Sequence, residues 1–342
     1  MHIILNGPFN RLCQLDRCVH NASCKKSFWR TCLVDIKIDY LCENIPNQAG
    51  KVAIVTGGAL GIGYYISKGL VSKSVHVFIG AKCKQTAMAA IDRIHEDFPN
   101  AKIDFIQLDL ASLQSVKSFA EEFLSRDLPL HILINNAGIM MPPYEETVDG
   151  FESQFQVNFL SHFYLTQLLL AKLTQSGKDE RWSRIVNVSS YMHRIGRPFI
   201  TKLGQRAQTW FEYSSHKAYA DSKLLIVAAT LALHHQLRAS GAPVSASAIH
   251  PGIVTSGLWR HLTWVHRKPI SLLGKYIFLT PEKGAVTALF SALSPDLEGK
   301  SGCYYDKSAN TIPASLTQDA QFQTEVWSKS LSLIDSCVQS SE

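Results

Sequence analysis

Tyr219 and Lys223 lie four residues apart, directly before a strongly apolar run over residues 224–233. On a helix, residues at positions i and i+4 share one face, so the phenol and the ammonium group would lie close together. A cation close to a phenol favours the phenolate and lowers the phenol pKa from its ordinary value of about 10. The spacing therefore predicts a tyrosine that donates and accepts a proton as a general acid and base.

A second pair, Tyr213 and Lys217, has the same spacing. It precedes the long apolar run and lies among Ser, His and Lys residues, where a rigid helix is less assured. We therefore assign proton transfer to Tyr219 and Lys223. This chemistry suits hydride transfer, in which a proton must be delivered to or taken from the substrate oxygen.

Two further polar residues are candidates for the same site. Ser190 follows a β-rich apolar run, where its hydroxyl can hydrogen-bond a substrate oxygen and stabilise developing negative charge, with Ser189 as its supporting neighbour. Asn158 lies within an otherwise apolar helical stretch, where an unbonded amide would cost free energy. We expect it to mark a bend that holds a water relaying protons to Lys223. The alternatives, serines that cap a loop and an ordinary hydrogen-bonded asparagine, stay open.

A glycine-rich turn follows the first β-rich run of the chain and reads TGGALGIG over residues 56–63. Glycines permit a sharp turn and a close approach of the backbone to a pyrophosphate, while the start of the next helix presents unpaired N–H groups to it. A strand before the motif and a helix after it distinguish a dinucleotide site from an ordinary turn. The predicted cofactor-binding residues here are Thr56, Gly57, Gly61, Ile62 and Gly63.

The second β-rich run ends near Lys82, with no acidic residue before Asp92. An NAD site usually places an acid here for the ribose, whereas a cation suits the 2′-phosphate of NADP. NADP(H) is therefore the favoured cofactor, and NAD(H) stays open. Asp109, after the third run, is placed to meet the adenine or to cap the helix that starts near Ser112. Further residues predicted to line the cofactor site are Asn136, Ala137, Gly138, Tyr219, Lys223, Pro251, Gly252 and Thr255.

From Lys51 onward, the sequence alternates short β-branched apolar runs with amphipathic stretches of ten or more residues. Near-continuous apolar runs are typical of parallel strands that are covered on both faces. The alternation predicts an α/β protein with a Rossmann-type, doubly wound parallel sheet flanked by helices. The expected strands are Val52–Thr56, Val75–Ile79, Ile103–Leu108, His131–Asn135, Arg184–Ser189 and Val244–Ile249, and the expected helices are Gly61–Lys73, Gln85–Phe98, Leu113–Ser125, Gly150–Thr174 and Ala218–Ala239.

We expect a single domain over residues 51–335, preceded by an N-terminal extension over residues 1–50 that shows no sustained strand or helix period. The domain includes a substrate lid at about 256–279. This segment mixes large apolar residues with Arg and Lys, which suits a lid over an apolar pocket or a helix lying on an anionic membrane surface. Ordinary core packing is the third interpretation.

The composition argues against several classes of protein. With 46% hydrophobic residues among 342, the chain can bury a large core, which argues against disorder. The net charge of +6 is not concentrated in a dense Lys/Arg run, which argues against a nucleic-acid partner. No apolar run reaches the length of about 18 residues that a membrane-spanning helix needs. The eight cysteines match no zinc-binding spacing and are predicted to be free thiols, so no metal site is expected.

As a set, these motifs resemble those of the short-chain dehydrogenase/reductases, from Lys51 to about Lys329. Within that family the chain is most similar to the X-linked and retinol-dehydrogenase-like members, over segments such as LHILINNAGIMM at 130–141 and FLTPEKGA at 278–285. The motifs that carry the resemblance are TGGALGIG at 56–63, NNAG at 135–138, Asn158, Ser190, Tyr219 with Lys223, and Pro251-Gly252.

The resemblance implies a nicotinamide-dependent oxidoreductase that interconverts a lipophilic alcohol and its aldehyde or ketone, with a polyprenol/dolichal-like or retinoid-like substrate. It assigns the catalytic tetrad to Asn158, Ser190, Tyr219 and Lys223. It also implies a homodimer through the helices that carry Asn158 and Tyr219. The basic loop 194–211 is a few residues longer than in these relatives. Because this loop borders the substrate, the identity of the substrate cannot be inferred from the relatives.

The same relatives usually begin with an apolar anchor or signal segment, which residues 1–50 do not supply. We therefore expect a cytoplasmic protein, or one peripheral on endoplasmic reticulum or lipid-droplet membranes through residues 256–279; secretion is implied by the family resemblance only. The intact tetrad favours an active enzyme over the alternative, a catalytically silent NADP(H)-binding scaffold or redox sensor. A sugar-nucleotide epimerase would share the tetrad, but its glycine spacing differs and the apolar lid suits sugars badly.

Overall fold

The structure is a computed structural model that describes residues 45–178, 181–198, 200–204, 213–254 and 279–339. The chain divides into a unit Met1–Lys37 and a unit Ile38–Glu342, and all the described residues belong to the second. Within it, one sheet has the strand order β3-β2-β1-β4-β5-β6-β7-β8. The strands are β1 (Val52–Thr56), β2 (His76–Ala81), β3 (Ile103–Gln107), β4 (Ile132–Asn135), β5 (Ser183–Val188), β6 (Val244–His250), β7 (Cys303–Asp306) and β8 (Ala309–Asn310).

Strands β1 to β7 pair in parallel, and β8 pairs with β7 in the antiparallel direction. The chain runs outward from β1 to β3 and then returns to place β4 on the other side of β1. This reversal creates a switch point between the carboxyl ends of β1 and β4, the position where doubly wound sheets bind their ligands. The predicted Rossmann-type sheet is therefore confirmed, and the glycine turn after β1 lies at its switch point.

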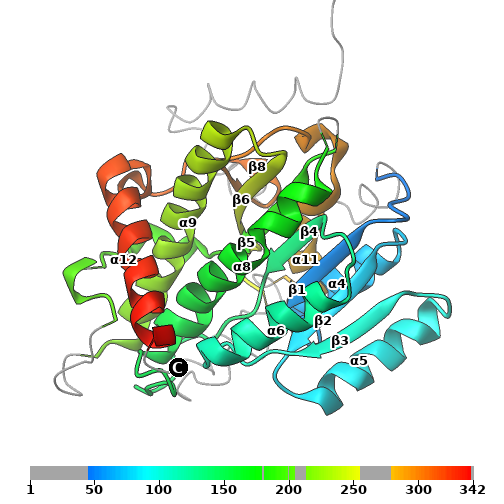
Figure 1. Cartoon of the computed structure of the whole chain (residues 1–342), viewed down its shortest axis with the longest axis horizontal. Helices are drawn as coiled ribbons and strands as arrows, with labels where there is room; N and C mark the ends of the chain where they lie inside the picture. Colours follow the sequence, from blue (N-terminus) through cyan, green and yellow to red (C-terminus); the bar gives the residue numbers. More distant parts are fainter. Residues whose placement is uncertain (1–44, 179–180, 199, 205–212, 255–278, 340–342) are drawn as a thin grey trace, which may run out of the picture. The chain divides into compact units, whose positions relative to one another are not determined.

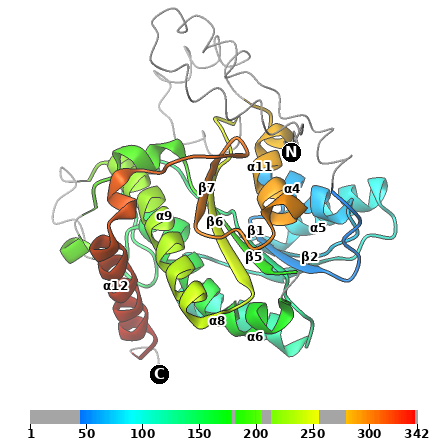
Figure 2. The ribbon, with the colours of Figure 1, turned by 90° about the horizontal axis from the view of Figure 1, so that it is seen from above.

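Helices cover both faces of the sheet (Figure 1 and Figure 2). Helices α4, α5 and α11 lie on one face, and α6, α8 and α9 lie on the other, with α12 packed against α9 and α6. Because both faces are covered, β1 and β6 are buried along their whole length. The helices are α4 (Gly61–Val71), α5 (Lys84–Asp97), α6 (Leu113–Ser125), α7 (Ser153–Phe155), α8 (Ser161–Ser176), α9 (Ser215–Ser240), α11 (Pro281–Leu293) and α12 (Ala320–Gln339).

All six expected strands are present, with no end shifted by more than two residues. The main departure is the helix expected over Gly150–Thr174, which starts at Ser153 and contains a π-helical stretch, η3, over Gln156–Leu160. A π turn inserts one extra residue into the helix and is often found at functional sites. The irregularity predicted at Asn158 is thus confirmed, since this residue is the central one of η3.

The helix that carries the predicted proton-transfer pair begins earlier than expected, at Ser215 rather than Ala218. Its start is set by Ser214, whose hydroxyl accepts a hydrogen bond from Lys217 N. The elements after β6 were not assigned from the sequence. One of them, α11, begins with a capping Thr280 followed by Pro281 at the first helical position, a sequence signal for a helix start.

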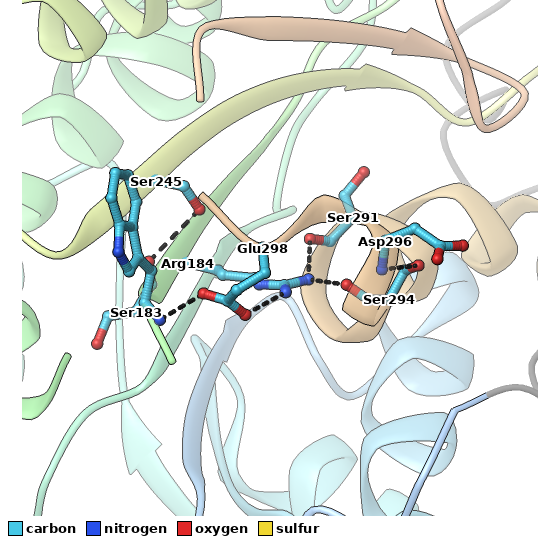
Figure 3. Close-up of polar contacts among 8 residues, drawn as sticks. Ser183, Arg184, Ser245, Ser291, Ser294, Asp296 and Glu298 are labelled. Carbon is cyan, nitrogen blue, oxygen red and sulfur yellow. Dashed lines mark hydrogen bonds and ion pairs between the residues drawn. The ribbon is translucent and has the colours of Figure 1, made fainter. Parts of the chain in front are cut away.

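A buried arginine fixes the far end of the sheet, at the amino end of β5 (Figure 3). Arg184 donates to the carbonyls of Ser294 at 2.7 Å and Ser291 at 3.3 Å, and it pairs with Glu298 at 3.0 Å. The other Glu298 oxygen accepts from Trp182 N at 2.6 Å. These contacts join the end of α11 and the turn after it to the amino end of β5, whereas the glycine turn lies at the carboxyl ends of the strands.

Helix α12 closes the outer surface beside α8 and α9. Its Val326 and Ile334 are buried, and the Trp327 ring packs edge-on against Phe163 of α8, with the ring centroids 4.8 Å apart. The two helices through which a homodimer was predicted are therefore partly covered within the chain itself.

Two further sequence predictions concern the chain as a whole. Among the described residues, Cys83, Cys303 and Cys337 form no disulfide, and the other five cysteines lie outside the described residues. No helix within the described residues is long and apolar enough to cross a bilayer. Ahead of Lys51, Ile45 is buried and its carbonyl accepts from Lys73 Nζ at 2.8 Å, so the last residues before the predicted domain pack against the end of α4.

Candidate functional site

The predicted proton-transfer pair lies buried at the carboxyl end of β5. Lys223 Nζ is 5.7 Å from the centre of the Tyr219 ring and donates to the carbonyl of Val188 at 3.0 Å. Ser190, two residues beyond that carbonyl, hydrogen-bonds the Tyr219 phenol. The structure therefore brings together the phenol, the hydroxyl and the ammonium group that the sequence predicted.

The pKa of the phenol differs from the expectation. Burial raises the pKa of Tyr219 to about 12 and outweighs the hydrogen bond with Ser190, which lowers it. Burial likewise lowers the pKa of Lys223 to about 8. The predicted lowering of the phenol pKa by Lys223 is therefore wrong for the protein without cofactor, because removal from water disfavours the charged form of each group.

The second pair with the same spacing, Tyr213 and Lys217, makes contacts with other residues. The Tyr213 hydroxyl donates to the Glu152 carboxylate at 2.9 Å and accepts from Gln154 Nε2 at 2.9 Å, while Lys217 forms an ion pair with Asp221. Tyr213 lies ahead of α9 and fixes the chain to the start of α7. The structure therefore separates this pair from Ser190 and leaves Tyr219 beside it.

Ser190 is held by neighbours that the sequence did not reveal. Its hydroxyl accepts from Met192 N at 3.3 Å, and its carbonyl accepts from His193 Nδ1 at 2.7 Å. His193 Nε2 in turn accepts from Ala314 N at 3.1 Å, and Tyr191 N donates to His250 Nδ1 at 3.2 Å. Two imidazoles thus orient the turn after β5.

These imidazoles are neutral at physiological pH. Burial lowers the pKa of His193, and it lowers the pKa of His250 to about 4. In each ring a nitrogen accepts from a backbone N–H, and protonation would replace that acceptor with a donor. Ser189, the predicted supporting residue, instead donates from its hydroxyl to the carbonyl of Lys223 at 2.8 Å and so ties β5 to α9.

Asn158 is completely buried and fully hydrogen-bonded. Its Oδ1 accepts from Ile139 N at 2.8 Å, and its Nδ2 donates to Ile139 O at 3.0 Å and to Ser222 Oγ at 3.1 Å. The side chain therefore joins the loop after β4 to α9, one residue before Lys223. A Cβ on Gly138 would lie 3.1 Å from Asn158 Oδ1 and 3.6 Å from Lys223 Nζ, so glycine keeps the space between these two residues open.

The glycine turn fits a pyrophosphate. Gly57 and Gly61 adopt positive φ angles of 64° and 55°, which disfavour other residues. A Cβ on Gly63 would collide with the Gly57 carbonyl oxygen, so α4 packs closely on the turn. Among the described residues, no side chain caps the start of α4 and its first turn has no acid. Its N–H groups and its positive dipole end are thus suited to a phosphate.

A pocket of about 400 Å³ runs along this rim of the sheet. Five of the predicted cofactor residues line it, namely Gly57, Lys82, Asp109, Ala137 and Gly138. Leu60 and Cys83 also line it and were not predicted, although each adjoins a predicted position.

Thr56 and Ile62, in contrast, are buried. Their side chains therefore hold the backbone of the glycine turn in place and do not face the pocket. Asn136 acts in the same way, since its Nδ2 donates to the Thr56 carbonyl at 2.9 Å.

Lys82 and Asp109 form an ion pair at 2.8 Å at the adenosine end predicted for this pocket. The Lys82 side chain is 73% exposed, so it can reorient toward a phosphate at little cost. Of the two roles predicted for Asp109, the helix-capping one is wrong. Ser112 caps α6 instead, by accepting from Ser115 N at 3.2 Å. Asp109 instead accepts from Ala111 N and faces the pocket.

The segment after β6 is described only in part. Gly252 has a φ of 88°, which disfavours any other residue, and a Cβ there would also displace the Leu279 side chain, whose Cδ1 would lie 2.5 Å away. Leu279 N donates to Ile253 O at 2.8 Å, which places the two ends of the intervening segment together. Thr255 and the predicted lid up to residue 278 lie outside the described residues.

The chain is similar to known proteins over most of its length. The family model for short chain dehydrogenase matches residues 51–202. Polyprenol dehydrogenase of Danio rerio is 42% identical over 294 residues, which cover 85% of this chain and 89% of that protein. Retinol dehydrogenase 12 of Homo sapiens is 36% identical over 300 residues, which cover 86% of this chain and 89% of that protein.

Two solved structures extend the likeness to the fold. An uncharacterized protein from Mycobacterium paratuberculosis has a TM-score of 0.68 and 28% identity, covering 86% of this chain and 97% of its own. RhlG of Pseudomonas aeruginosa, solved as a complex with NADP, has a TM-score of 0.61 and 24% identity over 79% of this chain and 98% of its own.

Proposed function

Because the chain belongs to the short-chain dehydrogenase family and is an NAD(P)-dependent oxidoreductase acting on CH–OH groups, we propose that it interconverts a lipophilic alcohol with its aldehyde or ketone, using Tyr219 as general acid and base. The observation that carries this proposal is the contact between the Tyr219 phenol and Ser190, with Lys223 beside them and close to Gly138, which lines the pocket.

The roles of the side chains follow from their contacts. When bound, the nicotinamide supplies the hydride in reduction and accepts it in oxidation. Tyr219 donates the phenolic proton to the substrate oxygen in reduction, and Ser190 stabilises the negative charge on that oxygen. Lys223 carries the positive charge that stabilises the phenolate left behind. A phenol whose pKa is raised to about 12 is fully protonated at neutral pH and thus ready to act as the donor.

NADP(H) is the proposed cofactor, with NAD(H) as a weaker one. Support comes from Lys82, a cation at the end of β2 that lines the pocket, and from the absence of an acid within β2. Asp109 neutralises Lys82 in the protein without cofactor, and the 2′-phosphate would take over that ion pair.

A polyprenol/dolichal-like or retinoid-like substrate is the proposed class. The names of the similar proteins support it, as does the surface at the same rim of the sheet. Tyr191, Ile195 and Ile253 follow the carboxyl ends of β5 and β6 and are between 47% and 64% exposed. Exposed apolar side chains at this rim suit a ligand that is itself apolar.

A substrate panel tests the proposal. The full-length protein is assayed with NADPH and with NADH against retinal, a long-chain polyprenal, a steroid ketone and a simple aldehyde. We expect turnover with NADPH that is highest for the isoprenoid aldehydes. Turnover of small polar carbonyls alone would overturn the substrate class. NADPH binding without turnover of any carbonyl would favour the alternative, a catalytically silent NADP(H)-binding scaffold or redox sensor.

Peripheral membrane contact through residues 256–279 and homodimerisation complete the proposal. The first concerns residues that lie, apart from Leu279, outside the described part of the chain. Flotation with anionic liposomes tests it, with neutral liposomes as the control. The second is tested by sedimentation of the natural chain, in which we expect a dimeric mass; a monomeric mass at every concentration would contradict it.

A further inference from the structure

We propose that His162 is a positioning residue that joins the glycine turn to Asn158 and thereby fixes the wall of the cofactor pocket at residues 136–139. The proposal rests on the proposed function, in that it assigns His162 to the same cofactor site. His162 lies on α8, four positions after Asn158, and is not among the residues predicted from the sequence.

His162 is held by a hydrogen bond at each ring nitrogen. Nδ1 is 3.0 Å from the carbonyl oxygen of Asn158, and Nε2 is 2.8 Å from the hydroxyl of Thr56. A carbonyl oxygen can only accept, so Nδ1 carries the proton and Nε2 is the acceptor. The Thr56 hydroxyl therefore donates to His162. Burial lowers the pKa of His162 to about 4, which agrees with a neutral ring in this tautomer.

At one end, His162 completes the contacts of Thr56. The Thr56 hydroxyl oxygen accepts from Asn136 N at 2.9 Å and from Ala137 N at 3.0 Å. With two N–H groups directed at its oxygen, the hydroxyl needs an acceptor for its own proton. His162 Nε2 offers one at 2.8 Å, whereas the carbonyl of Ile134 lies at 3.5 Å. The imidazole thus sets the direction of the hydroxyl that holds the start of the pocket wall.

At the other end, His162 fixes Asn158 through its carbonyl. The Asn158 side chain binds both the N–H and the carbonyl of Ile139, and it reaches Ser222 next to Lys223. The segment 136–139 is therefore held by Thr56 at its start and by Asn158 at its end. Ala137, Gly138 and Ile139 line the pocket between these two contacts. His162 is the side chain that connects the two.

The consequence is a link between cofactor binding and the orientation of the tetrad. Loss of the imidazole would leave the Thr56 hydroxyl without its short acceptor and would remove the imidazole N–H from the Asn158 carbonyl, both in a buried environment. The pocket wall and the space between Asn158 and Lys223 at Gly138 would loosen together. We therefore expect weaker NADPH binding and slower turnover from the same substitution.

The test uses variants that remove the two contacts separately. His162→Phe keeps a ring but removes both, His162→Asn keeps a donor near Nδ1, and His162→Gln keeps an acceptor near Nε2. Thr56→Val removes the partner hydroxyl. NADPH dissociation constants are measured by calorimetry, and kcat is measured at saturating NADPH. The matched control is Thr230→Val, which removes another buried hydroxyl, bonded to Asn187 at 2.9 Å and away from the pocket.

We expect His162→Phe to raise the NADPH Kd and to lower kcat by about tenfold or more each, with His162→Asn and His162→Gln intermediate. Thr56→Val should raise the Kd at least as much, because it also removes the acceptor of Asn136 N and Ala137 N. The double variant Thr56→Val/His162→Phe should raise the Kd by less than the product of the two single effects. The control should lose thermal stability with Kd and kcat unchanged.

The proposal is overturned if folded His162→Phe keeps both Kd and kcat within twofold of the natural protein. It is also overturned if the effects of His162→Phe and Thr56→Val on Kd multiply in the double variant, since unlinked residues act independently. If His162→Phe does not fold, His162→Gln and Thr56→Val carry the same comparison. The Kd measurement needs no turnover, so it decides the role of His162 even if the proposed substrate fails.

Discussion

The raised pKa of Tyr219 predicts that the two directions of the reaction differ in their dependence on pH. At pH 7, a phenol with a pKa of about 12 is ionised in one molecule in about 100,000, and forming the phenolate costs about 7 kcal/mol. Reduction uses the neutral phenol and needs no ionisation. Oxidation needs the phenolate as base, so its kcat should rise about tenfold per pH unit between pH 6 and 8 while the reductive kcat stays level.

Lys223 sets how far this profile extends. Its pKa of about 8 means that it loses its positive charge above that pH, so the oxidative profile should flatten there. With the ammonium group about 6 Å from the phenol and an effective dielectric constant of about 20, its attraction for the phenolate is on the order of 3 kcal/mol, which the cost of burying the phenolate exceeds in the protein without cofactor. Lys223→Met should therefore lower oxidation at pH 7 by about 100-fold and reduction by much less.

The assay follows NADPH absorbance in both directions at saturating cofactor from pH 5.5 to 9.5. The matched control is Lys217→Met, which removes an exposed lysine from the second Tyr–Lys pair and should leave both profiles unchanged. An oxidative kcat that does not change between pH 6 and 8, or a Lys223→Met profile that coincides with that of the natural protein, would refute the reasoning.

Three further predictions address the cofactor, the sheet and the histidines. Lys82→Glu should raise the KM for NADPH at least tenfold and change that for NADH less, because a carboxylate repels the 2′-phosphate; equal changes in both steady-state KM values would count against it. Arg184→Leu should lower the free energy of unfolding by about 3 kcal/mol in denaturant titration, at the low end for a broken buried pair because Glu298 keeps some contact with water; a loss below about 1 kcal/mol would contradict this. His162 and His250 stay neutral in the folded protein down to about pH 4, whereas the unfolded chain binds protons below about pH 6.5. Stability should therefore fall with decreasing pH across this range, by about 1.4 kcal/mol per pH unit for each histidine, and His250→Gln should reduce the slope; an unchanged slope would show that His250 is not one of the groups responsible.

Much of the fold was predictable because its signals are local. The apolar runs of β1 and β4 are buried on both faces, so their composition alone marks them as parallel strands. The glycine turn is recognisable because it needs glycine for backbone reasons at Gly57 and Gly61. The choice of Tyr219 over Tyr213 followed from the apolar run after it, and the structure places Tyr219 against Ser190.

The remaining features depend on contacts between distant parts of the chain. The pKa of Tyr219 is set by burial on all sides, which a helical spacing does not show. His162 could be noticed as the fourth residue after Asn158, but its other partner, Thr56, lies 106 positions away. His193 likewise reaches Ala314 across 121 positions. Such pairings are fixed by the topology of the sheet, so no local sequence pattern predicts them.

The central claim is that the Tyr219 phenol transfers the proton beside a bound nicotinamide. The most direct measurement compares Tyr219→Phe with Tyr213→Phe, two substitutions that each remove one hydroxyl, for NADPH-dependent carbonyl reduction and for NADPH binding. We predict that Tyr219→Phe loses at least 1,000-fold in kcat while its NADPH Kd changes little, and that Tyr213→Phe stays within about tenfold of the natural protein. Tyr219→Phe with near-natural turnover, or Tyr213→Phe with the greater loss, would contradict the account.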